Sequence, residues 1–412
     1  MIGQYTVIDG CRSCGSTDLS EVLDLGAMPL ADALVDPTAE GEEPHFPLSV
    51  WFCSDCTLVQ IRESVPPEVL FGADYPYYSS FSDALLDHSR SNVTDLIARC
   101  GLDESSLAVE IASNDGYLLQ YFRDAGVPVL GIDPAPGPAE AARRRGIPTR
   151  GGFFGTELAR TLVEEGVAAD VVVANNVLAH VPDQNDFVSG IATVLANDGL
   201  VSVEVPYVVD LVDGVEFDTI YHEHQCYFSV ESARRLFERH GLFLNDLERL
   251  SIHGGTLRLR FQKNRLPSDA VEMVLAEERA RGAHSFAFYA DFGHRVEGVR
   301  RDLTALVDGL KSDGATVAAY GAAAKGATLL NYTGIGTDRL DFVVDRNHHK
   351  QGRLMPGVGL RIEAPNRLTE TMPDYVLMLA WNFADEIMAQ QQAYLAAGGR
   401  FILPVPSPRI VP

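Results

Sequence analysis

Lysine is scarce in this sequence, and positive charge is outnumbered by negative. Only four of the 33 basic residues are lysines, and 57 acidic residues give a formal net charge of −24. Such a field repels nucleic acids and anionic membranes, because both require a basic footprint on the protein. We therefore expect neither as a partner. The phosphates of a small substrate would need a local site built from helix N-termini and a few cations.

Long apolar runs are also missing. No stretch of about 18 apolar residues could form a membrane-spanning helix, and residues 1–10 lack the basic start and apolar stretch of a signal peptide. The composition, 46% hydrophobic and 22% charged, is that of a soluble globular protein. We expect a cytoplasmic, monomeric protein, and a chain of 412 residues predicts two or three domains.

Four of the six cysteines form two C-x-x-C pairs, Cys11 with Cys14 and Cys53 with Cys56. Each pair can turn two thiolates toward one ion, and two such pairs complete a tetrahedral thiolate site. In a reducing compartment this pattern indicates a metal rather than disulfides. The sequence therefore predicts a structural Zn²⁺ site. The alternatives are a redox dithiol or two unrelated pairs.

Residues 68 to 265 alternate between apolar strand-like runs and helical patterns. The runs lie at 107–111, 129–133, 170–176 and 200–206. This alternation predicts a doubly wound parallel sheet that is buried on both faces. Segments 242–250 and 253–261 are expected to close this sheet as an antiparallel pair.

After a helical region at 269–312, a second strand–turn–helix pattern begins near residue 317. Further strands are expected at 340–345, 375–380 and 400–406. The C-terminal part is therefore predicted to be a second, smaller Rossmann-like α/β unit.

The segment V-E-I-A-S-N-D-G, residues 109–116, predicts a strand that ends in a cofactor-binding turn. Small and turn-forming residues allow the backbone to approach a nucleotide closely. The carboxylates of Glu110 and Asp115 would repel a pyrophosphate and attract the cationic S-adenosylmethionine. Asp133, at the end of the next strand, suits ribose hydroxyls. The expected cofactor-binding residues are Glu110, Ala112, Ser113, Asn114, Gly116, Asp133, Asn175 and Asn176.

Two other functions compete with a methyltransferase. One is a nicotinamide-dependent oxidoreductase, which the incomplete glycine fingerprint at both strand–turn–helix segments disfavours. The other is a zinc-anchored scaffold with a degenerate cofactor fold.

The loop Y-H-E-H, residues 221–224, follows the strand ending at 206 and is the candidate catalytic loop. Loops beyond strand C-termini hold substrates in doubly wound folds, and Tyr, His and Glu side chains supply acid–base groups. If the loop is extended, Tyr221 and Glu223 would lie on one side and His222 and His224 on the other. Simpler interpretations are that His222 only packs and that His180 caps a helix. An H-E-H metal site lacks an obvious third ligand.

Three further groups are candidates for binding substrate. Tyr75, Tyr77 and Tyr78 form an aromatic cluster, which could also be a hydrophobic seam between domains. Lys325 lies in the turn G-A-A-A-K-G, whose amides could bind a pyrophosphate, although the turn could be purely structural. Asn382 follows the strand expected at 375–380.

Four motifs in this order resemble the deoxysugar C-methyltransferase family, and they cover nearly the whole chain. They are the C-x-x-C pairs with M-P-L-A-D (28–32), V-E-I-A-S-N-D-G (109–116), Y-H-E-H-Q-C-Y-F-S (221–229) and Y-G-A-A-A-K-G-A-T-L-L-N-Y (320–332). The nearest branch is the tetronitrose-pathway sugar 3-C-methyltransferases. The resemblance implies a zinc-binding domain (1–67), a class I methyltransferase domain (68–280) and a Rossmann-like domain that binds the nucleotide sugar (281–412).

The resemblance also implies roles for single residues. His224 would be the base, with Tyr221, Glu223, His180 and Tyr75 as the other catalytic residues. The implied substrate is a dTDP-linked 4-keto deoxysugar or amino sugar of antibiotic biosynthesis, methylated at carbon 3 through an enolate. The alternative is O- or N-methylation of a nucleotide sugar, which needs no ketone.

Overall fold

The part of the chain that holds the two C-x-x-C pairs is built around two small antiparallel sheets. We analysed a computed structural model that describes residues 5–70 and 78–412. One sheet has the order β11-β4-β3-β2 and the other pairs β1 with β5. The strands are β1 (Thr6–Val7), β2 (Leu19–Met28), β3 (Phe46–Cys53), β4 (Val59–Ile61), β5 (Glu63–Ser64) and β11 (Cys226–Tyr227). The short helix α1 (Pro67–Leu70) follows β5. Strand β11 comes from far along the chain, directly after the Y-H-E-H loop.

The central sheet has seven strands in the order β12-β13-β10-β9-β6-β7-β8. Its parallel strands are β6 (Ala108–Ile111), β7 (Val129–Asp133), β8 (Thr149–Gly151), β9 (Ala169–Asn175) and β10 (Leu195–Pro206). The predicted antiparallel pair is confirmed as β12 (Phe243–Leu250) and β13 (Thr256–Gln262), with β13 also antiparallel to β10. The helices around this sheet are α2 (Asp83–Cys100), α3 (Leu119–Asp124), α4 (Pro136–Arg144), α5 (Thr156–Glu164), α6 (Gln184–Val194), α7 (Val208–Gly214) and α8 (Val230–Glu238).

The C-terminal sheet has the order β16-β15-β14-β17-β18-β19 and is parallel except for its last strand. Its strands are β14 (Val317–Tyr320), β15 (Val343–Val344), β16 (Ile362–Glu363), β17 (Tyr375–Met378), β18 (Arg400–Leu403) and β19 (Arg409–Val411). The helices are α11 (Ala324–Thr333), α12 (Arg367–Thr371), α13 (Ala384–Gln390) and α14 (Gln392–Ala396). The second Rossmann-like unit is therefore confirmed, while the antiparallel edge strand β19 was not predicted.

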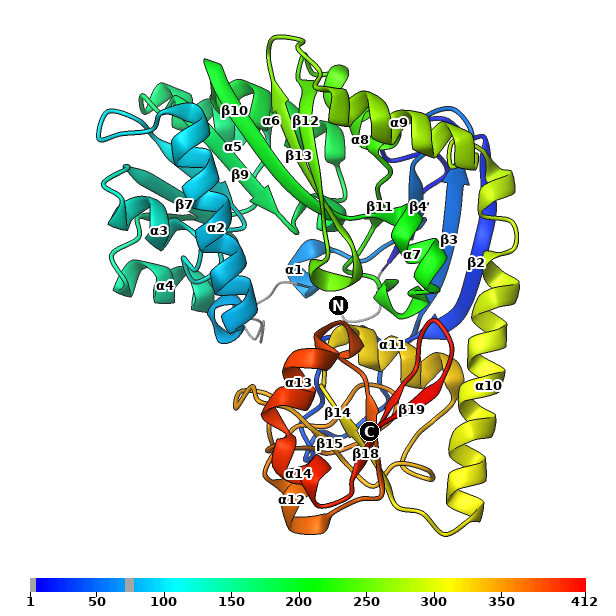
Figure 1. Cartoon of the computed structure of the whole chain (residues 1–412). Helices are drawn as coiled ribbons and strands as arrows, with labels where there is room; N and C mark the ends of the chain where they lie inside the picture. The colour runs from blue at the N-terminus through cyan, green and yellow to red at the C-terminus, as the bar shows by residue number, and fades with distance from the viewer. Residues whose placement is uncertain (1–4, 71–77) are drawn as a thin grey trace.

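The region expected to be helical at 269–312 divides into two helices. Helix α9 (Asp269–Arg281) ends at Gly282, which adopts the left-handed conformation that often ends helices (φ +76°). Helix α10 (Phe292–Ser312) then packs against β2 and runs down one side of the molecule to the C-terminal sheet (Figure 1).

A shared hydrophobic core connects the four-stranded and seven-stranded sheets to the C-terminal α/β unit. Phe52 of β3, Val203 of β10 and Leu329 of α11 belong to one cluster of buried residues. The domain boundaries expected at 67 and 280 stay a prediction. Over the described ranges, no helix is both long and apolar enough to cross a membrane.

Candidate active site and metal centre

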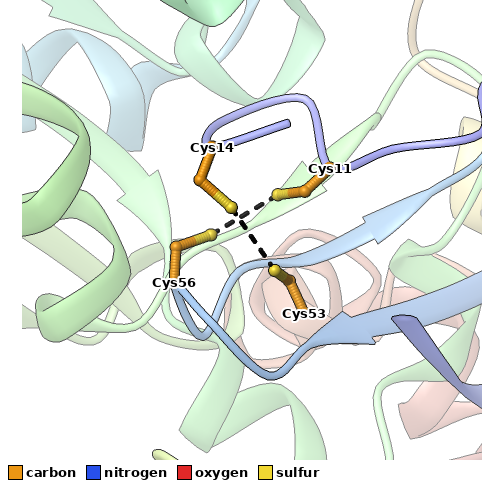
Figure 2. Close-up of side chains that lie close together, drawn as sticks. All are labelled: Cys11, Cys14, Cys53 and Cys56. Carbon is orange, nitrogen blue, oxygen red and sulfur yellow. Dashed lines mark hydrogen bonds between the residues drawn. The ribbon is translucent and has the colours of Figure 1, made fainter. Parts of the chain in front are cut away.

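The two C-x-x-C pairs converge on one point, as Figure 2 shows. All four sulfur atoms lie within 4.8 Å of one another. The shortest approaches join different pairs, at 3.4 Å between Cys11 and Cys56 and 3.6 Å between Cys14 and Cys53. A tetrahedral Zn²⁺ with four thiolates places its sulfurs ~3.8 Å apart. The geometry therefore fits the predicted zinc site, and its four protein ligands leave no open position for catalysis.

The cofactor turn after β6 has an unusual backbone. Ala112, Asn114 and Gly116 all have positive φ angles, of +58°, +49° and +78°. A non-glycine residue in this region is strained, and such strain gathers at functional sites where the surroundings enforce it. The Asn114 N–H donates to Asp133 Oδ2 (2.8 Å), and its side-chain oxygen accepts from the Ser79 N–H (2.9 Å). The turn is thus held in a conformation that exposes its backbone to a ligand.

A cavity of about 730 Å³ lies in front of this turn. Five of the predicted cofactor residues line it: Ala112, Asn114, Asp133, Asn175 and Asn176. The other three, Glu110, Ser113 and Gly116, are buried but do not line the cavity.

The carboxyl groups of Glu110 and Asp115 differ in their protonation and in their partners. Burial raises the pKa of Glu110, with nearby Asp133 and Asp115 adding to the effect, and its Oε2 has no hydrogen-bond partner. Asp115 instead pairs with Arg145 at 3.0 Å and accepts a hydrogen bond from Ser80. Arg145 thus offsets part of the negative charge of Asp115, and the attraction of the sulfonium by Asp115 stays a prediction. The unpartnered Oδ1 of the cavity-lining Asn175 is an acceptor that fits the donor groups of S-adenosylmethionine, whereas Glu110 does not line the cavity and its raised pKa favours the neutral form.

The cavity is shared by two sheets. In the central sheet the turns after β6, β7, β9 and β10 line it, and in the C-terminal sheet those after β14, β15 and β17 do so. In open α/β sheets ligands bind outside the carboxyl ends of the strands, where the strand order reverses. Two such crevices therefore face one space, and Asp32 reaches that space from the zinc-binding part.

The Y-H-E-H loop places a histidine and a tyrosine together in this cavity. His224 Nδ1 donates to the carbonyl oxygen of Thr219 (2.8 Å), which fixes its tautomer. His224 Nε2 therefore keeps its lone pair and accepts a hydrogen bond from the Tyr221 hydroxyl (2.9 Å). The His180 ring lies edge-on to His224 at 4.7 Å between centroids. Three groups predicted to be catalytic thus meet at one point.

The extended conformation considered for this loop is wrong. Residues 221–223 form a turn, so that Tyr221, Glu223 and His224 all line the cavity. His222 points away, bonds the Pro47 carbonyl oxygen (3.0 Å) and packs against Phe46, which confirms the packing interpretation. No cluster of metal ligands forms here within the described part of the chain.

Glu223 is a buried carboxyl beside another carboxylate. Burial raises the pKa of Glu223 to about 8, and the charge of Asp32 contributes. A neutral carboxyl can donate a hydrogen bond at pH 7, which a carboxylate cannot.

His180 ends the 3₁₀ turn Leu178–His180, where burial lowers its pKa to about 4. An unfolded chain would protonate this histidine below its ordinary value of about 6.5, while the folded chain would not. We therefore expect His180 to decrease the free energy of unfolding by about 2 kcal/mol between pH 7.5 and pH 5. Urea unfolding at both pH values should show a smaller decrease for His180→Gln. An equal decrease in both proteins would contradict a buried neutral His180.

The substrate-binding predictions have mixed outcomes. Tyr75 and Tyr77 lie outside the described residues. Tyr78 and Asn382 line the cavity, and the Tyr78 ring stacks on His349 at 5.4 Å.

Lys325 also lines the cavity, but its charge is already compensated. Its ammonium lies over the Trp381 ring at 4.2 Å. Burial lowers the pKa of Lys325, and the carboxylates of Asp218 and Glu216 offset part of this decrease. Asp218 in turn accepts a hydrogen bond from the Trp381 indole (2.6 Å). This surrounding makes Lys325 a weaker candidate for binding a pyrophosphate than the G-A-A-A-K-G motif suggests.

Several charged residues of the cavity were not singled out from the sequence, among them Arg346, Lys350 and Asp32. Arg346 and Lys350 follow β15, and Asp32 ends the M-P-L-A-D phrase. Lys350 donates to the Ala322 carbonyl oxygen (2.8 Å) and lies 3.9 Å from Asp32. For Arg346 the sequence signal was its place two residues after a short strand, and for Lys350 it was the rarity of lysine in this chain.

Family models match three consecutive parts of the chain. They are described as "Putative zinc binding domain" (residues 11–71), "Methyltransferase domain" (86–245) and "C-methyltransferase C-terminal domain" (251–406). The cofactor turn on a seven-stranded sheet with an antiparallel end, together with these matches, defines an S-adenosylmethionine-dependent methyltransferase that also binds zinc. The chain is 40% identical to C-methyltransferase NovU of Streptomyces niveus, over 98% of this chain and 97% of that protein. It belongs to this family of C-methyltransferases.

Two solved structures are similar to part of the chain. Magnesium protoporphyrin IX methyltransferase of Synechocystis PCC 6803, solved with bound SAH, is 16% identical, with a TM-score of 0.36 over 43% of this chain and 83% of that one. The PH0226 protein of Pyrococcus horikoshii OT3 is 13% identical, with a TM-score of 0.38 over 46% and 95%.

Proposed function

We propose that this C-methyltransferase methylates carbon 3 of a dTDP-linked 4-keto deoxysugar or amino deoxysugar in antibiotic deoxysugar biosynthesis. One observation carries the proposal. The Tyr221–His224 pair opens into a cavity that joins the cofactor turn to a second Rossmann-like crevice. An enzyme that methylates a nucleotide-linked sugar needs these three subsites side by side.

Carbon methylation requires a carbanion-like carbon, and the side chains around the cavity suit its formation. A 4-keto group acidifies the proton on carbon 3. His224 Nε2 takes that proton, and the electron pair of the C–H bond moves to give an enolate with its charge on the ketone oxygen. The Tyr221 hydroxyl then leaves His224 and donates to the enolate oxygen, with His180 beside it. When bound, S-adenosylmethionine supplies the methyl group.

The second crevice suits the nucleotide diphosphate. The strand order reverses at β14, so the crevice lies between the turns that follow β14 and β17. The N-terminus of α11 lines this side of the cavity together with Arg346 and Lys350, and such groups favour phosphate. Arg346 is paired with Glu386 (3.0 Å) and Lys350 lies 3.9 Å from Asp32, so both cations would exchange a carboxylate partner for the phosphate. We propose Tyr77 and the cavity-lining Tyr78 and Asn382 as further substrate contacts, and Tyr75 as a further catalytic residue.

The test is methyl transfer from labelled S-adenosylmethionine to a panel of nucleotide-linked sugars. We expect label in dTDP-linked 4-keto sugars and none in the matching 4-hydroxy sugars, with NMR placing the methyl group on carbon 3. In deuterated water the proton on carbon 3 should exchange in an enzyme-dependent way. A product methylated on oxygen or nitrogen, or no label in any ketosugar, would overturn the proposal.

A further inference from the structure

Arg12 lies between the two cysteines of the first C-x-x-C pair. Its side chain extends away from the zinc site and donates hydrogen bonds to backbone carbonyl oxygens of two other segments. Its guanidinium donates to the carbonyl oxygens of Ile61 and Glu63 (both 3.3 Å), on either side of the end of β4. It also donates to the carbonyl oxygen of Pro182 (3.4 Å), two residues after His180. One side chain thus joins the zinc-binding sheet to the segment that carries His180.

The backbone after His224 makes a second connection to the same two places. The Gln225 N–H donates to the Ala179 carbonyl oxygen (2.7 Å), and the Ile61 N–H donates to the Gln225 carbonyl oxygen (3.0 Å). Strand β11 then continues antiparallel to β4, with Cys226 opposite Gln60. Gln60 in turn accepts a hydrogen bond from the Arg12 backbone N–H through its side-chain oxygen (2.9 Å). His180 and His224 are therefore both fixed to β4, and Arg12 is bonded to that strand and its continuation.

The turn between Cys11 and Cys14 is itself anchored by other contacts that do not reach these histidines directly. Asn185 of α6 donates to the carbonyl oxygens of Arg12 (3.1 Å) and Ser13 (3.0 Å). Arg239, just after α8, donates to the Ser13 carbonyl oxygen (2.7 Å). Arg239 therefore offers a matched control, since it is an arginine that binds the same turn without touching residues 179–182.

We infer that Arg12 is a positioning residue, which uses the zinc site as a fixed point to set the spacing of His180 and His224. The inference rests on the proposed roles of these two histidines. The planar guanidinium suits this task because it donates several hydrogen bonds in fixed directions, whereas a lysine ammonium cannot reproduce the fork. Catalytic groups must be held to within a fraction of an ångström, and a misplacement of about 1 Å can cost about 100-fold in rate.

The kinetic test compares Arg12→Ala, Arg12→Lys and Arg239→Ala with the wild-type enzyme at equal zinc content, measured by elemental analysis. We expect kcat to fall about 10- to 100-fold in Arg12→Ala, the range found when groups that support a site are removed. Arg12→Lys should recover part of this loss. The KM for the ketosugar and the Kd for S-adenosylmethionine, measured by calorimetry, should change less than about twofold, because the cofactor turn is not part of this network.

A second readout does not depend on which substrate is methylated. Amide hydrogen exchange followed by mass spectrometry should be faster in Arg12→Ala at residues 178–182 and 224–227, unchanged at 110–116, and unchanged at all three in Arg239→Ala. If Arg12→Ala folds too poorly to measure, Arg12→Lys carries the same exchange test. Unchanged exchange in the Arg12 variants would overturn the inference even if C-methylation is established. Faster exchange at these segments would support the positioning role of Arg12 even if no ketosugar is methylated. Failure to methylate any ketosugar would overturn only the proposed function.

Discussion

Replacing His224 with asparagine should lower kcat for methyl transfer by about 10²- to 10⁴-fold, the usual contribution of a general base. The ring nitrogen that accepts from Tyr221 is the available base, because the other nitrogen is committed to the Thr219 carbonyl oxygen. Exchange of the carbon 3 proton in deuterated water should fall with kcat, since the same proton transfer is lost. Calorimetry should show an unchanged Kd for S-adenosylmethionine.

Tyr221→Phe is the companion variant, because it keeps the ring stacked on His224 (4.1 Å) and removes only the hydroxyl. If that hydroxyl stabilises the enolate oxygen, both kcat and proton exchange should fall by about 10²- to 10³-fold, as for loss of one oxyanion donor. Near-normal turnover in His224→Asn would refute its role as base. If His224→Asn still exchanges the carbon 3 proton at the normal rate, His224 would act in a step that follows proton removal and would not be the base.

Loss of one zinc ligand should produce the largest effect on stability. Cys53 ends β3 and is fully buried among the four cysteines, so Cys53→Ser leaves an incomplete site. Zinc binding at structural thiolate sites contributes about 10 to 16 kcal/mol to folding in small domains. We expect the variant to lose its zinc and the sheet of β2, β3, β4 and β11 to open, which inactivates the enzyme because β11 continues the Y-H-E-H loop.

Elemental analysis, limited proteolysis and thermal unfolding would measure this effect. Cys100→Ser is the matched control, since Cys100 is half-buried on α2 and lies outside the cluster. That variant should keep its zinc and its resistance to protease. One zinc per chain and wild-type stability in Cys53→Ser would contradict a four-cysteine site.

The sequence predicted those features whose signal lies within a few residues. The C-x-x-C spacing indicated the metal site, and the period of apolar residues indicated the strands of both α/β units. The antiparallel pair at 242–261 and the cofactor turn followed from similar local patterns. In these segments neighbouring residues carry most of the conformational signal, as the left-handed backbone of Gly116 (φ +78°) illustrates.

Other outcomes depended on contacts between distant segments. The sequence motif around Lys325 suggested a phosphate site, but Glu216, Asp218 and Trp381 surround that lysine in the fold. From the sequence, Asp115 was expected to attract a cationic cofactor, but in the fold it forms an ion pair with Arg145. The charge available to a ligand is set by such partners, and their identity is not readable from either segment alone.

The amino-acid sequence by itself thus determined the ligands of the zinc site, the cofactor turn and the two α/β units, because spacing and periodicity express local geometry. Only the tertiary structure decided which side chains share the cavity. It turned His222 toward Pro47 and His224 toward Tyr221, although they are two residues apart. It also made the strand after His224 part of the zinc-binding sheet. The physical reason is that the direction of His222 and the pairing of β11 depend on hydrogen bonds between segments more than 160 residues apart, which no local pattern records.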